Sequence, residues 1–406
     1  MMNIGSGWQN GRFPIEPLSP PFASHCQLRQ REKVIKIRRK FVRDRGDIVD
    51  LEIIPLDESQ LKAAPKDDFG FGNKFSNRMF TQHYTSGVGW HDAKIGPYEP
   101  FVLPPSTAVF HYAQEIFEGT KAYRRPDGNI NLFRPWENAK RFNNSAVRMS
   151  MPVVDEEDHL AAIVKLVELE NDWVPEADGA ALYIRPTMIA TEPALGVHAS
   201  KEYIHFVITG PVGSYFATGF NPVAVYIEDK YIRAVAGGVG SAKTGGNYAA
   251  SLYVGAEAQK KGYSQVLWLD AIERRYVEEV GAMNICFVYE GKRVVTPALS
   301  GSILPGVTRN SVLTLGADLG YEMVEGRVDV HEMLADIASG KITEVFGCGT
   351  AAVIAPVGKF GFQDKEYVIN DNEPGPVSKH LFKELTDIQY GRIPDRFGWT
   401  YTIEVK

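Results

Sequence analysis

A single lysine set among glycines is the feature of this sequence that most constrains its possible folds. Residues 236–248 read AGGVGSAKTGGNY, so Lys243 has three glycines upstream and two downstream. Glycine allows unusual backbone dihedral angles and a close approach of the backbone to a ligand. A lysine amine becomes a useful nucleophile when its surroundings hold it and lower its pKa. The stretch therefore predicts a glycine loop that presents one amine.

Three interpretations of this loop compete. In the first, Lys243 forms a Schiff base with a carbonyl cofactor or substrate. In the second, residues 237–244 form a phosphate-binding loop, but Ala242 stands where that motif requires glycine before the lysine. In the third, the loop is a glycine turn with a solvated lysine, the usual fate of this residue. The loop alone does not decide between them.

The composition is that of a globular protein with more than one core. A chain of 406 residues is too long for one ordinary core, so we expect two domains. No apolar run is long enough to cross a bilayer, and the net charge of −6 does not favour nucleic-acid binding. The three cysteines are far apart and form no C-x-x-C motif. We therefore expect no metal site, no disulfide framework and a reducing compartment.

The N-terminal segment differs from the rest of the chain. Residues 1–45 carry ten basic and three acidic side chains after a proline-rich start. We interpret residues 1–47 as a disordered extension, with a start-site artefact and an organelle transit peptide as the alternatives. We therefore expect a cytoplasmic location, with organelle import as the less favoured possibility.

The remainder predicts an α/β protein with a small N-terminal domain at 48–211, a linker at 212–222 and a larger domain at 223–406. In the first domain we expect a helix at 110–118 that stops at Gly119, and an amphipathic helix at 155–173 with Asp155 as its N-cap. In the second domain we expect a strand at 284–289, a hairpin at 358–368 and a helix at 377–385.

Alternation along residues 182–187 places Tyr183 and Arg185 on one face of a strand. This pair suits either a bound carboxylate or a salt bridge at the rim.

Two further stretches can bind an anion. Residues 304–310 read LPGVTRN, a loop that ends in a helix N-terminus with free N–H groups. Residues 347–352 form a second glycine turn after a strand, with a hydroxyl and amides. The carboxylates of residues 277–281 (VEEVG) belong to a buried segment. Together with Lys243, these are the parts that a pyridoxal phosphate enzyme needs.

At this point the chain resembles a known family. From about Asp68 to the C-terminus it is similar to the branched-chain amino acid aminotransferases of fold-type IV, in the longer subgroup that includes the animal enzymes. The motifs that carry the resemblance are FEG at 117–119, LFRPW at 132–136, EPALGV at 192–197, GGNY at 245–248, EVGAMN at 279–284, LPGVTR at 304–309 and DIQYG at 387–391.

The resemblance implies pyridoxal phosphate as cofactor and a role for each matching residue. Lys243 matches the Schiff-base lysine, which also moves the proton between substrate Cα and cofactor C4′. Tyr248 matches the partner of the phenolic oxygen. Glu279 matches the partner of the pyridine nitrogen, which leaves Glu278 as a solvated neighbour. The implied phosphate ligands are Arg141, Val307, Thr308 and Thr350.

The resemblance also implies a mostly aromatic substrate pocket in a homodimer. Its residues are Phe71, Tyr112, Tyr183, Arg185, Tyr215 and Ala351. In the family, the tyrosine that matches Tyr112 is supplied by the partner subunit.

The chain departs from the family pattern in three respects. Ala352 and Ala355 replace the C-x-x-C redox pair of the animal enzymes, so we expect no thiol regulation of that kind. Ala282 stands where the subgroup often has threonine, which removes one hydroxyl near the substrate carboxylate. Cys286 occupies a place often held by an aromatic residue. None of these changes alters the expected chemistry.

The expected activity is transfer of the amino group from L-leucine, L-isoleucine or L-valine to 2-oxoglutarate. Within the same fold, the alternatives are a D-amino acid aminotransferase and an aminodeoxychorismate lyase, which usually lack the GGNY motif. A rival of another class is a nucleotide-binding regulatory protein built on the near-match to a phosphate loop. It predicts binding of ATP or GTP and no visible chromophore.

Overall fold

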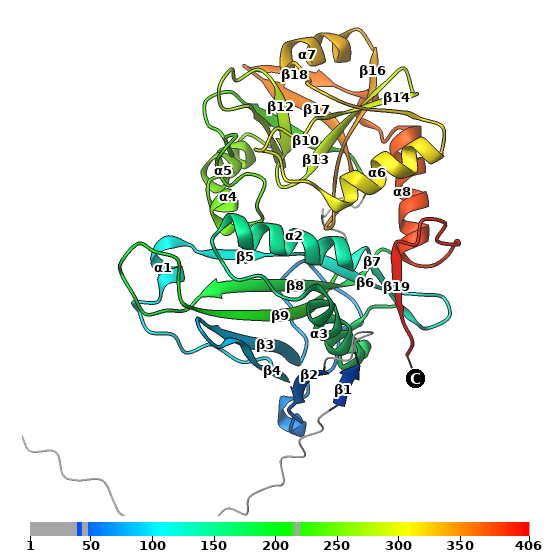
Figure 1. Cartoon of the computed structure of the whole chain (residues 1–406). Coiled ribbons are helices and arrows are strands. Elements are labelled where there is room, and N and C mark those ends of the chain that lie inside the picture. The colour runs from blue at the N-terminus through cyan, green and yellow to red at the C-terminus, as the bar shows by residue number, and fades with distance from the viewer. Residues whose placement is uncertain (1–38, 43–47, 214, 216–219, 406) are drawn as a thin grey trace, which may run out of the picture. The chain divides into compact units, whose positions relative to one another are not determined.

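A computed structural model describes residues 39–42, 48–213, 215 and 220–405 (Figure 1). Residues 36–406 form one compact unit that contains two large sheets. The extension predicted at 1–47 lies outside the described residues, apart from strand β1 (Arg39–Val42), which pairs with β2 (Ile48–Ile53). The predicted division into a small and a larger domain stays a proposal. No helix of the described ranges is long and apolar enough to cross a membrane.

The first sheet has ten strands, in the order β1-β2-β4-β3-β9-β8-β6-β7-β19, with β5 paired to β8. All of its pairs are antiparallel except β2 with β4. The remaining strands are β3 (Arg78–Thr85), β4 (Gly89–Pro97), β5 (Glu115–Phe117), β6 (Thr120–Arg124), β7 (Ile130–Phe133), β8 (Ala181–Ala190), β9 (Glu202–Val212) and β19 (Thr400–Ile403).

Helices α2 (Pro135–Arg148) and α3 (Glu156–Leu169) cover one face of this sheet (Figure 1). Side chains alternate along a strand, so Leu182, Ile184 and Met188 of β8 pack in the two cores beneath these helices. Tyr183 and Arg185 point the other way and line a pocket. Strand alternation therefore separates the core of the first sheet from its functional face.

The second sheet has nine strands, in the order β12-β11-β10-β17-β16-β13-β14-β15, with β18 paired to β17. It mixes parallel and antiparallel pairs. Its strands are β10 (Val223–Glu228), β11 (Gln265–Leu269), β12 (Val277–Val280), β13 (Asn284–Tyr289), β14 (Arg293–Pro297), β15 (Glu322–Gly326), β16 (Ile342–Gly349), β17 (Val353–Phe362) and β18 (Lys365–Val368).

Helices bury both faces of the second sheet. Ile285 and Phe287 of β13 pack in the core that includes α7 (Val330–Ala338). Cys286 and Val288 face the opposite core, with α6 (Val307–Asp318) and α8 (Pro376–Gln389). A strand covered on both sides reads as an uninterrupted apolar run, and residues 285–288 (ICFV) do so. The predicted α/β class is confirmed.

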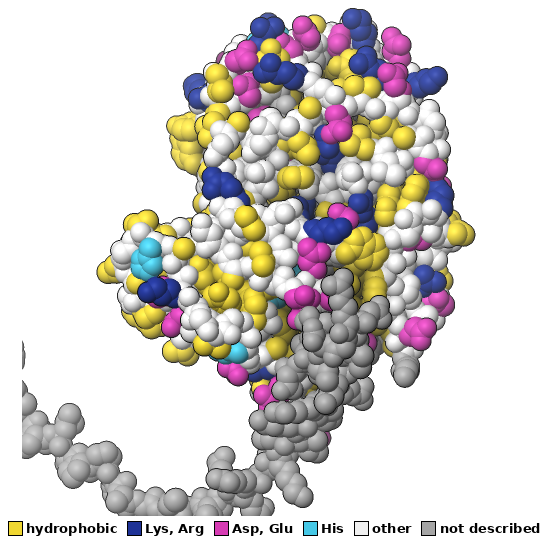
Figure 2. All heavy atoms as spheres, in the orientation of Figure 1, with side chains coloured by type: hydrophobic (Ala, Val, Ile, Leu, Met, Phe, Trp, Pro, Cys, Tyr) yellow, Lys and Arg dark blue, Asp and Glu magenta, His cyan; other side chains and the backbone are white. Residues whose placement is uncertain are grey.

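The short elements complete the chain. They are α1 (Ala108–Tyr112), α4 (Gly245–Ala249), α5 (Leu252–Lys260) and the 3-10 turns Glu58–Gln60, Asn171–Trp173 and Asn370–Asn372. Charged side chains of both signs are interspersed over the face that Figure 2 shows. That face therefore presents no extended field of one sign.

One element prediction is wrong. Helix α1 ends at Tyr112, and Ala113 adopts a left-handed conformation with φ of 48°. Residues 115–117 then form β5, which pairs with β8 and buries Ile116 completely. Tertiary pairing outweighs the helical spacing of the apolar residues at 110–118. The helix predicted at 155–173 is confirmed as α3, although it ends at Leu169.

The strand, hairpin and helix predicted for the second domain are confirmed as β13, β17 with β18, and α8. The sequence did not indicate the final strand. β19 leaves the region of α8 and pairs antiparallel with β7 of the first sheet. Trp399 and Ile403 are buried there, and the Trp399 carbonyl accepts the N–H of Arg134 at 2.7 Å.

Candidate active site

An open pocket lies where side chains of the two sheets meet. Every predicted site residue except Tyr112 lines it: Phe71, Arg141, Tyr183, Arg185, Tyr215, Lys243, Tyr248, Glu279, Val307, Thr308, Thr350 and Ala351. Their proximity is a property of the structure, whereas their roles remain predictions. No group of three or more His, Cys, Asp or Glu side chains within the described ranges is arranged to hold a metal.

The Lys243 amine lies inside this pocket. Its Nζ donates to the Tyr248 hydroxyl at 2.6 Å and lies 4.7 Å from the centre of the Phe117 ring. The backbone of Lys243 is fixed on both sides. Its N–H donates to Ser145 Oγ of α2 at 2.9 Å, and its carbonyl accepts the Phe117 N–H at 3.0 Å. The amine is therefore a held group in a pocket, which excludes the interpretation of a solvated turn.

One of the glycines around Lys243 is required by packing. A Cβ on Gly240 would lie 2.3 Å from the Ser302 carbonyl oxygen. Further along the loop, Asn247 donates to the carbonyls of Val239 and Ala242, each at 2.8 Å. The glycine spacing of the sequence thus reflects a loop pressed against its neighbours rather than a flexible turn.

Glu279 forms a buried carboxylate on the floor of the pocket. Its side chain is 3% exposed, and Oε2 forms an ion pair with Arg233 at 2.7 Å. Its other oxygen accepts the Leu304 N–H at 3.1 Å and the Asn284 amide at 3.2 Å. Burial raises the pKa of the Glu279 carboxyl, and the Arg233 guanidinium opposes that rise. Arg233 therefore favours the ionised form of a carboxylate that burial disfavours.

The expectation that Glu278 is solvated is wrong. Glu278 is 6% exposed and accepts hydrogen bonds from Ser300 at 3.3 Å and from Ser302. Residues on a strand point to alternate faces, so its side chain does lie opposite Glu279. The loop that carries Ser300 and Ser302 covers that face, and burial raises the pKa of the Glu278 carboxyl.

One end of the pocket is formed by Arg141 and the N-terminus of α6. Arg141 is 9% exposed and forms a two-point ion pair with Glu118, with distances of 2.7 Å and 2.9 Å. Its Nη1 donates to the Pro305 carbonyl at 3.0 Å, which places the guanidinium beside the start of α6. The first N–H groups of a helix lack partners within it. Those of Val307 and Thr308 lie where Arg141 supplies positive charge.

Glu118 is the buried counter-ion of this end. Its side chain is completely buried, and Asn138 donates to Oε2 at 2.8 Å. Although burial alone would raise it, the Arg141 guanidinium holds the pKa of the Glu118 carboxyl below its ordinary value. The pair therefore stays ionised, and Arg141 keeps a fixed orientation.

The opposite wall is aromatic and carries one arginine without an acidic partner. Phe71 contacts Tyr183 and Tyr215, with ring centres 5.3 Å and 5.1 Å apart. Arg185 donates to the Tyr183 hydroxyl at 2.8 Å and lies over the Phe117 ring. Its Nε is buried without a hydrogen-bond partner, and it forms no ion pair with any residue in the described ranges. These contacts favour the carboxylate-binding interpretation over the rim salt bridge.

Tyr112 lies outside the pocket of its own chain. It is 39% exposed on α1, and its hydroxyl donates to the Leu195 carbonyl. The expectation that it reaches the site of a partner subunit stays a prediction.

The model of the family described as amino-transferase class IV matches residues 115–360. The chain belongs to this family. Among relatives of this class IV aminotransferase, branched-chain-amino-acid transaminase 1 of Bacillus subtilis (strain 168) is 53% identical over 335 residues, covering 82% of this chain and 94% of the relative. A probable branched-chain-amino-acid aminotransferase of Streptomyces coelicolor is 50% identical over 350 residues, covering 86% and 96%. The predicted resemblance is confirmed.

Solved structures of branched-chain amino acid aminotransferases share the fold of this class IV aminotransferase. The Escherichia coli enzyme superposes with a TM-score of 0.65 at 26% identity, covering 79% of this chain and 98% of that one. The T.th. enzyme with pyridoxamine 5′-phosphate gives 0.65 at 29% identity, covering 79% and 97%.

Sequence reasoning missed the residues that hold the predicted site residues in place. Ser145, Arg233 and Glu118 contact Lys243, Glu279 and Arg141 respectively. The sequence does indicate a special role for Glu118, because it is the charged member of an FEG motif among apolar neighbours. It indicates none for Arg233 or Ser145, since a charge or a hydroxyl near a loop or on a helix is ordinarily solvated.

Proposed function

We propose that this class IV aminotransferase acts on branched-chain amino acids with pyridoxal phosphate as cofactor. It transfers the amino group of L-leucine, L-isoleucine or L-valine to 2-oxoglutarate and yields branched 2-oxo acids and L-glutamate. The observation that carries the proposal is the held amine of Lys243, 2.6 Å from the Tyr248 hydroxyl, between a buried carboxylate and an anion-binding helix end. The names of the relatives support this specificity over the two alternatives of the same fold.

The residues fit pyridoxal phosphate in chemical type. The cofactor needs an amine for its aldehyde, an anion for its pyridine nitrogen and a cradle for its phosphate. Lys243, Glu279 and Arg141 with the N-terminus of α6 supply these groups in one pocket. A Cβ on Gly306 would lie 2.0 Å from Asn284 Oδ1, so glycine lets the start of α6 lie close to this carboxamide. When bound, the cofactor supplies an electron-accepting ring that stabilises negative charge at the substrate Cα.

Lys243 and Tyr248 perform the proton chemistry in this proposal. Lys243 Nζ would hold the cofactor and, as a free amine, would move a proton between the substrate Cα and C4′. Its hydrogen bond to Tyr248 keeps the amine directed into the pocket. Glu279 would pair with the ring nitrogen, and the Arg233 ion pair favours the ionised form of this carboxylate.

The aromatic wall and Arg185 select the substrate. Burial of a leucine side chain against Phe71 and Tyr215 contributes on the order of 1.5–3 kcal/mol. Arg185 and the Tyr183 hydroxyl bind a carboxylate, which suits the group that all amino-acid substrates share and the second carboxylate of glutamate. Preference among the three branched substrates depends on this wall.

A homodimer in which Tyr112 joins the partner's pocket belongs to the same proposal. Phe110 of α1 is 61% exposed and Leu195, whose carbonyl accepts from Tyr112, is 63% exposed. Large exposed apolar side chains that gather at one place mark contact surfaces. A cytoplasmic location is likewise proposed.

The visible spectrum of the purified protein tests the proposal. We expect a yellow protein that bleaches with L-leucine and recovers with 2-oxoglutarate, whereas D-alanine and a chorismate-derived substrate have no effect. A response to a control alone would move the function to a neighbouring family. A protein that stays colourless after incubation with pyridoxal phosphate would refute the cofactor assignment. Lys243→Ala should abolish turnover, and wild-type rates in that variant would sink the mechanism.

A further inference from the structure

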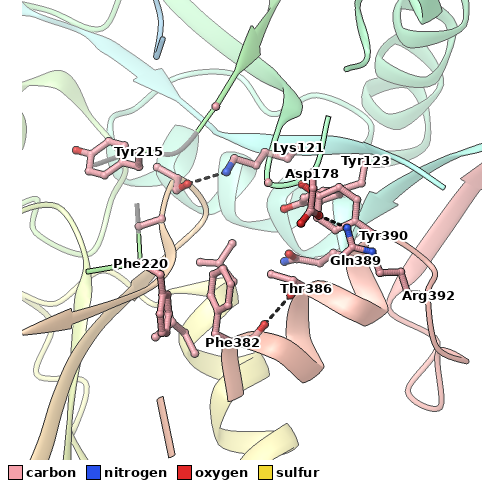
Figure 3. Close-up of a pocket in the computed structure, with 16 residues that line it drawn as sticks. Lys121, Tyr123, Asp178, Tyr215, Phe220, Phe382, Thr386, Gln389, Tyr390 and Arg392 are labelled. Carbon is pink, nitrogen blue, oxygen red and sulfur yellow. Dashed lines mark hydrogen bonds and ion pairs between the residues drawn. The ribbon is translucent and has the colours of Figure 1, made fainter. Parts of the chain in front are cut away.

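A second cavity adjoins the active-site pocket (Figure 3). Ala351 and Tyr215 line both spaces, so a thin wall separates them. The cavity is lined by apolar side chains that include Phe220, Ile354 and Phe382, and by polar and charged side chains that include Lys121, Asp178 and Gln389. Small-molecule sites combine apolar walls with polar groups that orient the ligand.

Lys121 of β6 provides a buried cation in this cavity. Its side chain is 5% exposed, and its Nζ donates to the Ala351 carbonyl at 2.6 Å. An ammonium group carries three N–H donors, so this bond uses one of them. No carboxylate pairs with Lys121 within the described part of the chain. A buried cation without a counter-ion is unfavourable unless an anion joins it.

The neighbouring charges do not neutralise Lys121. Arg392 forms ion pairs with both Asp178 and Asp387 at the edge of the cavity. Lys383 also forms an ion pair with Asp387. The two acids are therefore balanced by Arg392 and Lys383, and the positive charge of Lys121 is left in excess. Burial lowers the pKa of Lys121 to about 8, which leaves the amine mostly protonated at neutral pH.

Gln389 of α8 provides an unused acceptor. It is 3% exposed, and its Oε1 is buried without a hydrogen-bond partner. Buried polar atoms without partners are rare in folded proteins and point to a missing ligand or water. Figure 3 shows Gln389 on the same side of the cavity as Lys121, with Phe220 and Phe382 facing them.

We propose that this cavity is an accessory binding site for a small branched aliphatic carboxylate. The carboxylate accepts the two remaining N–H groups of Lys121, and the aliphatic body packs against Phe220 and Phe382. Two sources share this chemistry, a 2-oxo acid and an amino acid. The ammonium of an amino acid would donate to Gln389 Oε1, whereas a 2-oxo acid has no donor for it. Because Lys121 also holds the Ala351 carbonyl, an occupant would contact the wall of the active site.

Calorimetric titration of the holoenzyme with 4-methylpentanoate tests the site, with the cofactor absorption band recorded in parallel. We expect a saturable binding event that leaves this band unchanged and that persists in Arg185→Met, which weakens the catalytic pocket. Lys121→Met should weaken this event at least tenfold, and Lys121→Arg should retain it. Thr386→Phe, which fills the cavity from α8, should also abolish it. Lys379→Met makes the same charge change at an exposed position of α8 that does not line the cavity, and it should have no effect.

An event that Lys121→Met and Thr386→Phe both leave unchanged would overturn the proposal, as would the absence of any spectrally silent binding. Affinity should fall about tenfold per pH unit above pH 8, because the amine loses its charge there. If the ligand is an amino acid, Gln389→Leu should weaken the binding of L-leucine but not that of 4-methyl-2-oxopentanoate. If the ligand is a 2-oxo acid, Gln389→Leu should weaken the binding of neither compound. The result does not depend on transamination, so failure of the catalytic assignment would appear separately, as a protein that binds the acid but does not respond to L-leucine.

Discussion

Both carboxylate oxygens of Glu279 contact protein groups, and the charge of these groups determines which of them affects the protonation of the carboxyl. The Leu304 N–H and the Asn284 amide hold one oxygen, and Arg233 holds the other at 2.7 Å. Neutral donors fix the orientation of a carboxylate, whereas a guanidinium changes its proton affinity. Arg233 is therefore the residue that decides whether Glu279 is an anion.

Replacing Arg233 with methionine tests this control. The pKa of Glu279 is already raised by burial, and removal of the opposing cation raises it further. We expect the absorption band of the bound cofactor to vary with pH where that of the wild type is constant. Breaking a buried pair also costs about 3–5 kcal/mol of folding free energy, which urea unfolding measures. Arg233→Lys should restore most of the spectrum. An unchanged band and stability in Arg233→Met would contradict the assignment.

Glu118 offers the converse test, in which a buried arginine rather than a buried carboxylate loses its ion-pair partner. In Glu118→Gln the buried Arg141 guanidinium loses its counter-ion, so the cofactor-free protein should lose about 3–5 kcal/mol of stability. A phosphate bound at the start of α6 supplies the missing negative charge. Pyridoxal phosphate should therefore raise the melting temperature of this variant more than that of the wild type. Asn138→Ala, which removes a neutral partner of Glu118, is the control and should show a normal increase.

At the scale of elements, α3 depends on its N-cap. Asp155 accepts the backbone N–H groups of Glu157 and Asp158, both at 3.0 Å. Asp155→Ala should lower the free energy of unfolding by about 1 kcal/mol. Asp155→Ser keeps an acceptor at the cap and should retain most of this stability. A urea midpoint that does not differ between the two variants would show that the cap contributes nothing here.

An element could be predicted from the sequence when the residues that determine it are close together along the chain. Asp155 and the alternating strands carry local signals, so α3, β13 and the β17–β18 hairpin were predictable. Strand β5 was not, because only its partner β8 makes residues 115–117 extended. The same contrast between local and distant determinants holds for the residues of the site. Lys243 lies in a glycine motif that is visible locally, whereas Arg233 acts through its ion pair with Glu279, which is distant in sequence. Glu278 was predicted wrongly because the loop that buries it left no local sign.

At the scale of the whole molecule, two histidines set the response to acid. His159 of α3 and His205 of β9 stack with ring centres 5.0 Å apart, and none of their ring nitrogens has a partner within the described ranges. Both rings are buried between Phe142 and the first sheet. Burial lowers the pKa of His159 to about 4, with Glu118 opposing the change, and lowers that of His205 well below its ordinary value.

These shifts predict an acid-sensitive core. Below the ordinary histidine pKa of about 6.5, the unfolded chain binds protons that the folded chain excludes. Stability from His159 is therefore complete above that pH and is lost as the pH falls toward 4, by about 3 kcal/mol. His159→Leu should flatten the fall of the urea midpoint over this range. An equally steep fall in His159→Leu and wild type would contradict the prediction.

The position of β19 has a consequence for synthesis on the ribosome. Strand β7 is made well before its neighbour at the edge of the first sheet, which comes from residues 400–403. Until then β7 exposes a row of unpaired backbone groups, the kind of edge that recruits other strands. A nascent chain therefore cannot complete its first sheet until residues 400–403 have been made. Chaperones that bind nascent chains would protect this edge during the interval. A ribosome stalled before residue 400 would release an incomplete sheet that is prone to aggregation.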